Sequence, residues 1–417
     1  MIFDSGSSWG RSIIVLLFLA VPGSQLLAGK QDQPRRNEAE VKVLNHFLVL
    51  ADLAVRALNE EPPDREGWKK NPGLRNYYMF FVDSYAVRAL AVAYDLTGRQ
   101  RYLDACKTWT DRIVRHQDRM IPAGAYYMNY YRKPGESEGQ WFSADSGSIA
   151  MGVLSTAFRV TDQADRTRYI NSVRAYVDLV MDKFVRNTGG VTDGYWDKSD
   201  EEWWCSTALF SSAAFQLYNL TGEERYRRAA IDGVDWLLDF EYGDTILYDF
   251  ADGAPTTIFY ILEAYSSALP HLYPGTIRQE KVYARLSQTV EWIVDNQTAE
   301  GTWDYNPDNW GVKLGGLPCQ LLIYLKHVND PAVSGRLHIS PAGKGVPFGV
   351  LVGEATSRAL DYFSSEGVGE IFTQRNAFTM MSYAELLCPD ELYFKETDRF
   401  PYQRLSETDL SRLTTND

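Results

Sequence analysis

The chain has 417 residues, of which 45% are hydrophobic and 13% aromatic, and its formal net charge is −13. This much apolar material suffices for a large packed core, and a charged fraction of 23% excludes a disordered chain. The acidic balance argues against binding to nucleic acid or to an anionic membrane surface, because both need clustered basic side chains. Aromatic rings often line sites for sugars and other ring-bearing ligands, although most of them serve the core.

The N-terminal segment has the pattern of an export signal. Residues 13–21 are a run of nine apolar residues with Arg11 before it, and Ala28 lies at a plausible cleavage point. Nine residues are too few to cross a bilayer, so we expect residues 1–28 to be a signal peptide rather than an anchor. The protein is then expected to be exported, either to a periplasm or to the medium.

The cysteine pattern gives no sign of a metal site. The four cysteines, at positions 106, 205, 319 and 388, are widely spaced and form no C-x-x-C pair. In a chain of this size we expect buried free thiols and neither a zinc site nor a cofactor.

A repeated motif divides the chain into helical units. Residues 94–98 (YDLTG) are followed by Tyr102, and residues 218–222 (YNLTG) are followed by Tyr226 at the same offset. A looser copy begins at Phe158, between the other two. This spacing suits a unit of one helical hairpin with a long loop.

The expected helices alternate in character along the chain. Five are apolar nearly all round, namely residues 84–97, 146–160, 205–220, 254–269 and 311–326. Four have one polar face, namely residues 100–116, 166–185, 223–240 and 278–296. A helix that is apolar on every side must be buried on every side, whereas an amphipathic helix has one face in water. We therefore predict two concentric rings of helices, an all-α (α/α)6 toroid, whose sixth pair comes from residues 38–60 and 350–387. This single domain would span residues 29–388, and residues 389–417 would be a loose polar tail.

The segments that precede the expected inner helices are long and rich in aromatic residues. Inner helices of such a ring run parallel, so these segments should converge on one cleft, and long connections are usually functional. The candidate substrate-binding residues are Tyr78, Tyr126, Tyr130, Trp141, Asp193, Trp196, Trp203, Trp204, Tyr305 and Trp310. Alternatively, the aromatic side chains could simply plug the mouth of the toroid.

Two carboxylates stand out because they lie where charge is scarce. Asp83 and Asp145 open the first and second apolar helices, at equivalent places one repeat apart. Neighbouring helix axes lie about 8–10 Å apart, so the two side chains could act on one sugar as acid and base. Since Asp is also a favoured N-cap residue, capping alone would explain either of them.

The residues around both carboxylates resemble a known family. Residues 82–98 (VDSYAVRALAVAYDLTG) look like the segment with the first catalytic Asp of the unsaturated uronyl hydrolases, glycoside hydrolase families 88 and 105. Residues 144–154 (ADSGSIAMGVL) are similar to the segment with their second, general-acid Asp. The resemblance covers roughly residues 75–300 and implies a six-hairpin toroid that acts on oligosaccharides released by polysaccharide lyases. It also implies that Asp145 is the acid/base and that Asp83 positions the substrate or water. The expected partner is an oligosaccharide that contains uronic acid.

Other functions remain open at this level. A toroidal polysaccharide lyase or a sugar epimerase would keep the cleft and use a Tyr or His base, which residues 126–131 could supply. A non-catalytic glycan-binding toroid would keep the aromatic residues and need no acid. Terpene cyclases also use such toroids, but neither D-x-D-D nor D-D-x-x-D occurs in the sequence.

Overall fold

The computed structural model describes residues 38–59, 80–127, 141–192, 200–239, 254–303, 311–328, 337–339, 345–369, 372–393 and 404–405. All of them belong to the unit of residues 37–417, which is separate from residues 1–36. Within the described ranges, no helix combines the length and the apolar character needed to cross a membrane.

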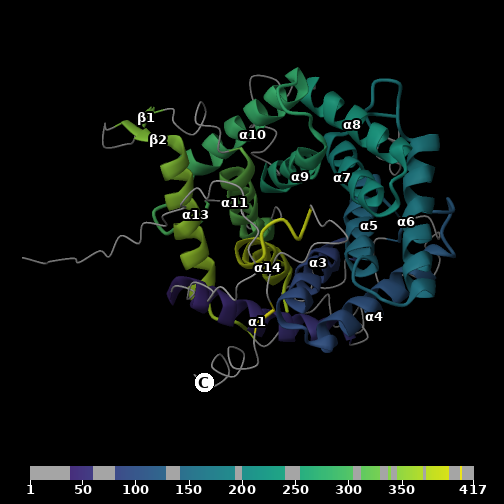
Figure 1. The fold of residues 1–417 in the computed structure, drawn as a ribbon, viewed down its shortest axis with the longest axis horizontal. Helices are drawn as coiled ribbons and strands as arrows, with labels where there is room; N and C mark the ends of the chain where they lie inside the picture. The colour runs from purple at the N-terminus through teal and green to yellow at the C-terminus, as the bar shows by residue number, and fades with distance from the viewer. Residues whose placement is uncertain are drawn as a thin grey trace, which may run out of the picture. The chain divides into compact units, whose positions relative to one another are not determined.

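Six of the described helices form an inner ring (Figure 1). They are α3 (Phe80–Thr97), α5 (Ser143–Ala157), α7 (Trp204–Thr221), α9 (Ala254–Ala268), α11 (Leu317–His327) and α14 (Gln374–Leu387). Each packs against the next in this order, and α14 packs back against α3, which closes the ring. The short 3-10 helix η4 (Gly311–Gly316) precedes α11 and also contacts α9 and α14.

A second set of helices surrounds the first. The outer helices are α1 (Glu38–Asn59), α4 (Gln100–Gln117), α6 (Gln163–Lys183), α8 (Glu224–Asp239), α10 (Ile277–Asp295) and α13 (Phe348–Ser365). The 3-10 helix η3 (Leu269–His271) follows α9, and a two-stranded antiparallel hairpin of β1 (Leu337–Ile339) and β2 (Gly345–Pro347) precedes α13. Helix α1 packs against α14, so the two ends of the sequence supply one inner–outer pair. The predicted all-α (α/α)6 toroid is confirmed.

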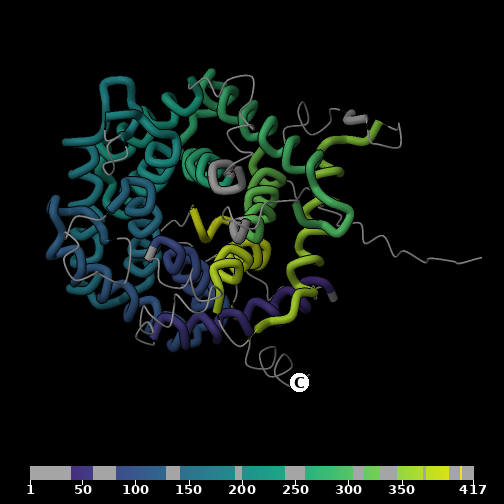
Figure 2. Tube along the Cα trace, turned by 180° about the vertical axis from the view of Figure 1, so that it is seen from behind, coloured from purple at the N-terminus to yellow at the C-terminus, as the bar shows by residue number. Residues whose placement is uncertain are grey.

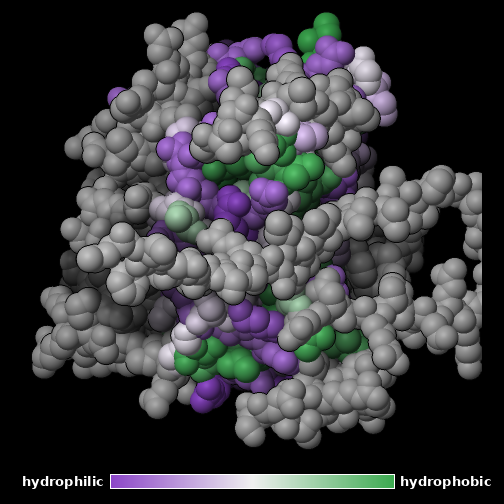
Figure 3. Space-filling model, turned by 90° about the vertical axis from the view of Figure 1, so that its left-hand side faces the viewer, coloured by the Kyte–Doolittle hydropathy of each residue, from purple (hydrophilic) through white to green (hydrophobic). Residues whose placement is uncertain are grey.

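Burial separates the two rings as the sequence pattern predicts. Every residue of inner helix α5 except Asp145 is buried. On outer helix α6 the buried residues form a single stripe that includes Tyr169, Val173, Tyr176 and Val180. Figure 3 shows the side of the molecule on which α13 lies. The described residues visible there form several apolar areas with hydrophilic residues beside them. Outer helix α6 therefore has one face packed on the core and the other face in water.

Small residues let the inner helices approach closely. A Cβ atom added at Gly147 of α5 would lie 2.7 Å from the carbonyl carbon and oxygen of Leu209 on α7. At Gly152, on the same helix, it would lie 2.9 Å from the Cβ of Ser84 on α3. Helix α5 thus lies tightly between its two neighbours, and glycine is required where their backbones meet.

A recurring ion pair joins successive outer helices. An Arg near the start of one helix binds an Asp of the preceding one, in the pairs Arg101–Asp52, Arg168–Asp111, Arg225–Asp178 and Arg278–Asp235. In the first three pairs the next residue is a Tyr whose ring lies under the guanidinium, with centroid distances of 5.1, 4.8 and 4.5 Å. The tyrosines of the sequence repeat are therefore part of the contact between hairpins.

The residues just after α14 are packed inside the ring. Glu391, Leu392 and Tyr393 are 5%, 4% and 0% exposed, and the segment crosses the centre of the ring when seen from behind (Figure 2). The side-chain amide of Gln216, on α7, donates to the carbonyl of Tyr393. The loose tail expected from residue 389 onward therefore does not begin there, because its first residues fill the space that the inner helices enclose.

All four cysteines are free and buried, as predicted. Burial raises the pKa of the Cys106 thiol to about 12, even though the nearby Arg159 opposes the shift. This thiol is therefore protonated and unreactive at neutral pH.

We expect Gly147→Ala to lower the free energy of unfolding by about 1–3 kcal/mol, because the added methyl group meets the backbone of α7. The matched control is Gly353→Ala on outer helix α13, where the added Cβ has no atom within 4 Å. This control should leave stability unchanged or raise it by up to about 1 kcal/mol through helix propensity. Urea unfolding followed by circular dichroism measures both, and equal stability of the two variants would contradict the close crossing of α5 and α7.

Candidate functional site

The two carboxylates singled out in the sequence lie in the first turns of neighbouring inner helices. Asp83 is the fourth residue of α3, and Asp145 is the third residue of α5. The N-cap of α5 is Phe142, so Asp145 does not cap its helix. Asp83 is 4% exposed, whereas Asp145 is the one residue of α5 that is not buried. Asp145 is therefore in the first turn of α5, where its charge favours the helix N-terminus, but it is not the N-cap residue.

A hydrogen bond joins α3 and α5 a short way along each helix from the two carboxylates. The hydroxyl oxygens of Tyr85 and Ser148 are 3.0 Å apart. Tyr85 follows Asp83 by two residues on α3, and Ser148 follows Asp145 by three residues on α5. The helices therefore run parallel here and present both carboxylates at the same end of the ring.

Two buried tyrosines lie within the electrostatic reach of Asp145. Burial raises the pKa of Tyr176 well above its ordinary value, and the nearby Tyr126 and Asp145 add to this shift. Burial likewise raises the pKa of Tyr260 on α9, followed by the effects of Tyr85, Asp145, Cys205 and Glu263. Both phenols stay protonated at neutral pH, and the hydroxyl of Tyr176 donates to the carbonyl of Ser143 at 2.8 Å.

Below the carboxylates, a polar cluster that the sequence analysis missed fills the ring. Arg88 and Glu263 form an ion pair of 2.8 Å in which the two side chains are 1% and 0% exposed. The Glu263 carboxylate also accepts hydrogen bonds from Tyr85 at 3.0 Å and from Tyr393 at 2.7 Å. Burial alone would lower the pKa of Arg88, but Glu263 and the two tyrosines raise it. The signal in the sequence was the presence of charged residues inside helices that are otherwise apolar.

The described aromatic candidates divide into core and surface. Tyr126 is 0% exposed, and its hydroxyl lies 2.8 Å from that of Ser172. Trp141 is 2% exposed and packs edge-on against Phe184. These two side chains belong to the core rather than to an open cleft, as in the alternative that aromatic residues plug the toroid.

Trp203 and Trp204 differ from those two residues. Trp203 immediately precedes inner helix α7 and is 40% exposed. Its ring meets that of Trp204 edge-on, with the centroids 5.9 Å apart. Trp203 is therefore the exposed ring among the described aromatic candidates. The remaining candidates, Tyr78, Tyr130, Asp193, Trp196, Tyr305 and Trp310, lie outside the described residues.

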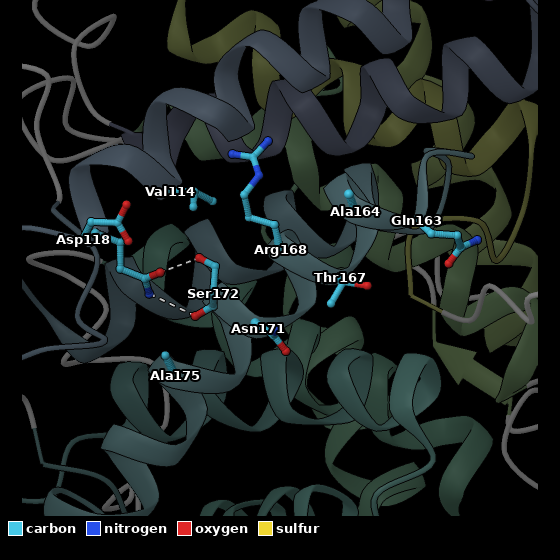
Figure 4. A pocket seen from close by; sticks show the side chains of 10 residues that line it. Val114, Asp118, Gln163, Ala164, Thr167, Arg168, Asn171, Ser172 and Ala175 are labelled. Atoms are coloured by element: carbon cyan, nitrogen blue, oxygen red, sulfur yellow. Dashed lines mark hydrogen bonds between the residues drawn. The ribbon is translucent and has the colours of Figure 1, made fainter.

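A separate groove of about 700 Å³ lies between outer helices α4 and α6 (Figure 4). Val114, Gln163, Thr167 and Asn171 are among its lining residues. Arg168 also lines the groove, and its guanidinium is already paired with the carboxylates of Asp111 and Asp165. Neither predicted catalytic Asp lines this groove, so it is distinct from the site around the two carboxylates. Among the described residues, no cluster of His, Cys, Asp and Glu could hold a metal ion.

Comparisons with known proteins agree with this arrangement. The model of Glycosyl Hydrolase Family 88 matches residues 77–253, which contain both carboxylates. No curated protein matches the chain in sequence. Similar solved structures include a UGL variant with dGlcA-Glc-Rha-Glc, at 11% identity and a TM-score of 0.57, over 86% of this chain and 99% of that one.

Two further structures are alike in fold. A possible member of family GH105 from Salmonella enterica serovar Paratyphi A is 13% identical with a TM-score of 0.52, over 88% of this chain and 99% of that one. A family 76 glycoside hydrolase from a bovine Bacteroides thetaiotaomicron strain is 12% identical with a TM-score of 0.51, over 83% and 78%. The resemblance seen in the sequence is confirmed: residues 77–253 match the model of glycoside hydrolase family 88, and the solved structures share the fold of the chain.

Truncation of the two tryptophans should separate core from surface. We expect Trp141→Ala to cost about 3–5 kcal/mol of unfolding free energy, because it leaves a cavity beside Phe184. Trp203→Ala should cost about 1 kcal/mol or less, because much of this ring is already in water. Chemical denaturation measures both, and a larger loss for Trp203 would mean that this ring is structural.

Proposed function

We propose that this protein hydrolyses unsaturated uronyl oligosaccharides. The observation that carries the proposal is that Asp83 and Asp145 each lie in the first turn of an inner helix, and that these two helices are neighbours joined by the Tyr85–Ser148 contact. The family match supports it because it spans both residues. The UGL structure supports it because that protein is described with an oligosaccharide that begins with dGlcA.

The difference in exposure of the two carboxylates suggests different roles. Asp145 is the accessible residue of α5, so it can reach both a sugar and a water molecule. Asp83 is nearly buried, which suits a group that orients the substrate or water from below. A catalytic acid must lie within hydrogen-bond reach of the atom that it protonates, and the partly exposed Asp145 suits this role better than the buried Asp83.

The proposed reaction is a hydration of the C4–C5 double bond. Asp145 donates its proton to C4 of the unsaturated ring, and a water molecule adds at C5. The same carboxylate then takes a proton from that water, which returns the enzyme to its starting state. The resulting hemiketal rearranges and releases the remaining sugar. One carboxylate thus serves in turn as acid and base.

Trp203 completes the proposed site as a sugar platform. It lies at the N-terminal end of α7, and α7 packs against α5, which carries Asp145. A partly exposed indole can cover the apolar face of a sugar ring that is held near the carboxylates.

Substitution of either carboxylate tests the proposed chemistry. We expect Asp145→Asn and Asp83→Asn to lower turnover of unsaturated disaccharides by about 10²–10⁴-fold, because acid/base catalysis or the orientation of water is lost. The assay is the loss of absorbance of the uronyl double bond. The matched control is Asp165→Asn. Asp165 also lies in the first turn of a helix, but this helix, α6, belongs to the outer ring, so the turnover of the variant should equal that of the wild type.

The same assay separates the alternative functions. Full turnover in both Asn variants would contradict the two-carboxylate mechanism. A rise in absorbance on intact polysaccharide would indicate a lyase. Oligosaccharide binding without any turnover by the wild type would indicate a glycan-binding protein.

We also propose that the protein is exported, on the basis of residues 1–28. This segment lies outside the described residues, so the support is its sequence pattern alone. Expression of the full chain in a bacterium, followed by cell fractionation and N-terminal sequencing, should give a mature protein that begins at Gly29. A cytoplasmic product that retains Met1 would contradict export.

A further inference from the structure

The centre of the ring contains a buried charge that the proposed reaction does not use. Glu263 is 0% exposed and lies in the middle of inner helix α9. Its carboxylate binds Arg88 at 2.8 Å, Tyr85 at 3.0 Å and Tyr393 at 2.7 Å. Removing two charges from water costs several kcal/mol per ion, and apolar packing often replaces such a pair without loss of stability. Stability alone therefore gives no reason for a buried ion pair at this place.

The hydrogen bonds of Glu263 lead to the two helices that carry the predicted catalytic residues. A tyrosine hydroxyl has a single proton, and that of Tyr85 is donated to Glu263. In the contact between Tyr85 and Ser148 the serine must then be the donor. The result is a directed chain from Ser148 on α5 through Tyr85 on α3 to Glu263 on α9.

This chain meets both helices within one turn of the predicted catalytic carboxylates. Tyr85 follows Asp83 by two residues, and Ser148 follows Asp145 by three. Over so short a distance a helix is stiff, so a shift of the backbone at Tyr85 or Ser148 moves the backbone that carries the nearby carboxylate. Apolar contacts tolerate small sliding movements, whereas hydrogen bonds weaken steeply with distance and angle. The network can therefore set a spacing that packing alone leaves loose.

We propose that Glu263 is a positioning residue. Through the hydroxyls of Tyr85 and Ser148 it fixes how α3 and α5 present the two carboxylates to the substrate. The inference rests on the proposed function, because the carboxylates need a fixed separation only if they act on one substrate.

The main test compares the turnover of two variants that each lose one buried hydroxyl group. Glu263→Gln leaves Arg88 buried without its counter-charge and can unfold the protein, so Tyr85→Phe is the principal variant. The control is Thr110→Val, which removes the hydroxyl that donates to Thr156, at 2.9 Å, near the far end of α5. Both variants delete one buried hydroxyl that contacts α5, but only Tyr85 is close to Asp145.

We expect Tyr85→Phe to lower kcat by about 10- to 100-fold relative to Thr110→Val, since misplacement by about 1 Å can have this effect. KM should stay within about twofold of the wild type, because the sugar platform is unchanged, and the two variants should melt at similar temperatures. Glu263→Gln, where it folds, should show the same loss of kcat. A kcat for Tyr85→Phe within about twofold of the control would overturn the proposal.

Crystal structures of the wild type and of Tyr85→Phe supply a readout that does not depend on activity. The separation of the Asp83 and Asp145 carboxyl carbons should change in the variant, and an unchanged separation would also overturn the proposal. If Asp145→Asn abolishes turnover while Tyr85→Phe behaves like the control, the proposed function stands and the positioning role fails. If the wild type turns over no unsaturated disaccharide, the proposed function fails, and the carboxyl separations alone decide the positioning role.

Discussion

The structure depends on the need to fill the axis of a closed ring of buried helices. Helices that are apolar on all sides pack against neighbours on both flanks, yet six of them leave a central space. The protein fills it with an ion pair, Arg88–Glu263, and with the rings of Tyr85 and Tyr393. Among the described residues, the Nε and Nη2 atoms of Arg88 have no hydrogen-bond partner, but its guanidinium lies 5.3 and 5.0 Å from the two ring centroids. Interaction with the aromatic faces offsets part of the desolvation cost.

The outer ring solves a different problem, which is the attachment of one hairpin to the next. Each Arg–Asp pair bridges successive outer helices close to water, where a single ion pair contributes little. The pairs contribute because the same contact recurs between successive hairpins. In two of them a tyrosine hydroxyl also donates to the carboxylate, as in Tyr102–Asp52 and Tyr169–Asp111. The inner ring is therefore specified by packing and one central charge network, and the outer ring by a contact that recurs with the sequence repeat.

Sequence patterns predicted the architecture because the periodicity of each helix reports directly on how many of its faces are buried. The same logic found Asp83 and Asp145, since a charge at the end of an apolar helix is conspicuous. It did not find the Glu263 network, because Tyr85 and Tyr393 are 178 and 130 residues away from Glu263. Tyr393 also lies where composition indicated a tail.

The aromatic candidates show the same limit on a smaller scale. Trp141 and Trp203 both precede an inner helix and are indistinguishable by residue type, yet they are 2% and 40% exposed. Which of them reaches solvent depends on packing against Phe184 in one case and Trp204 in the other. Such partners are set by the three-dimensional arrangement, so residue type and local spacing could not separate core from surface.

The closure of the ring has a consequence for how the chain is made. His46, on α1, lies 2.9 Å from the hydroxyl of Tyr383, on α14, and these residues are 337 positions apart. Ribosomes release the chain from its N-terminus, so α1 and α3 emerge long before the helix that completes their burial. Until then the nascent hairpins expose apolar flanks to one another and to neighbouring chains, which favours aggregation and slow folding. The burial of the first helices is thus completed only when the last inner helix is in place.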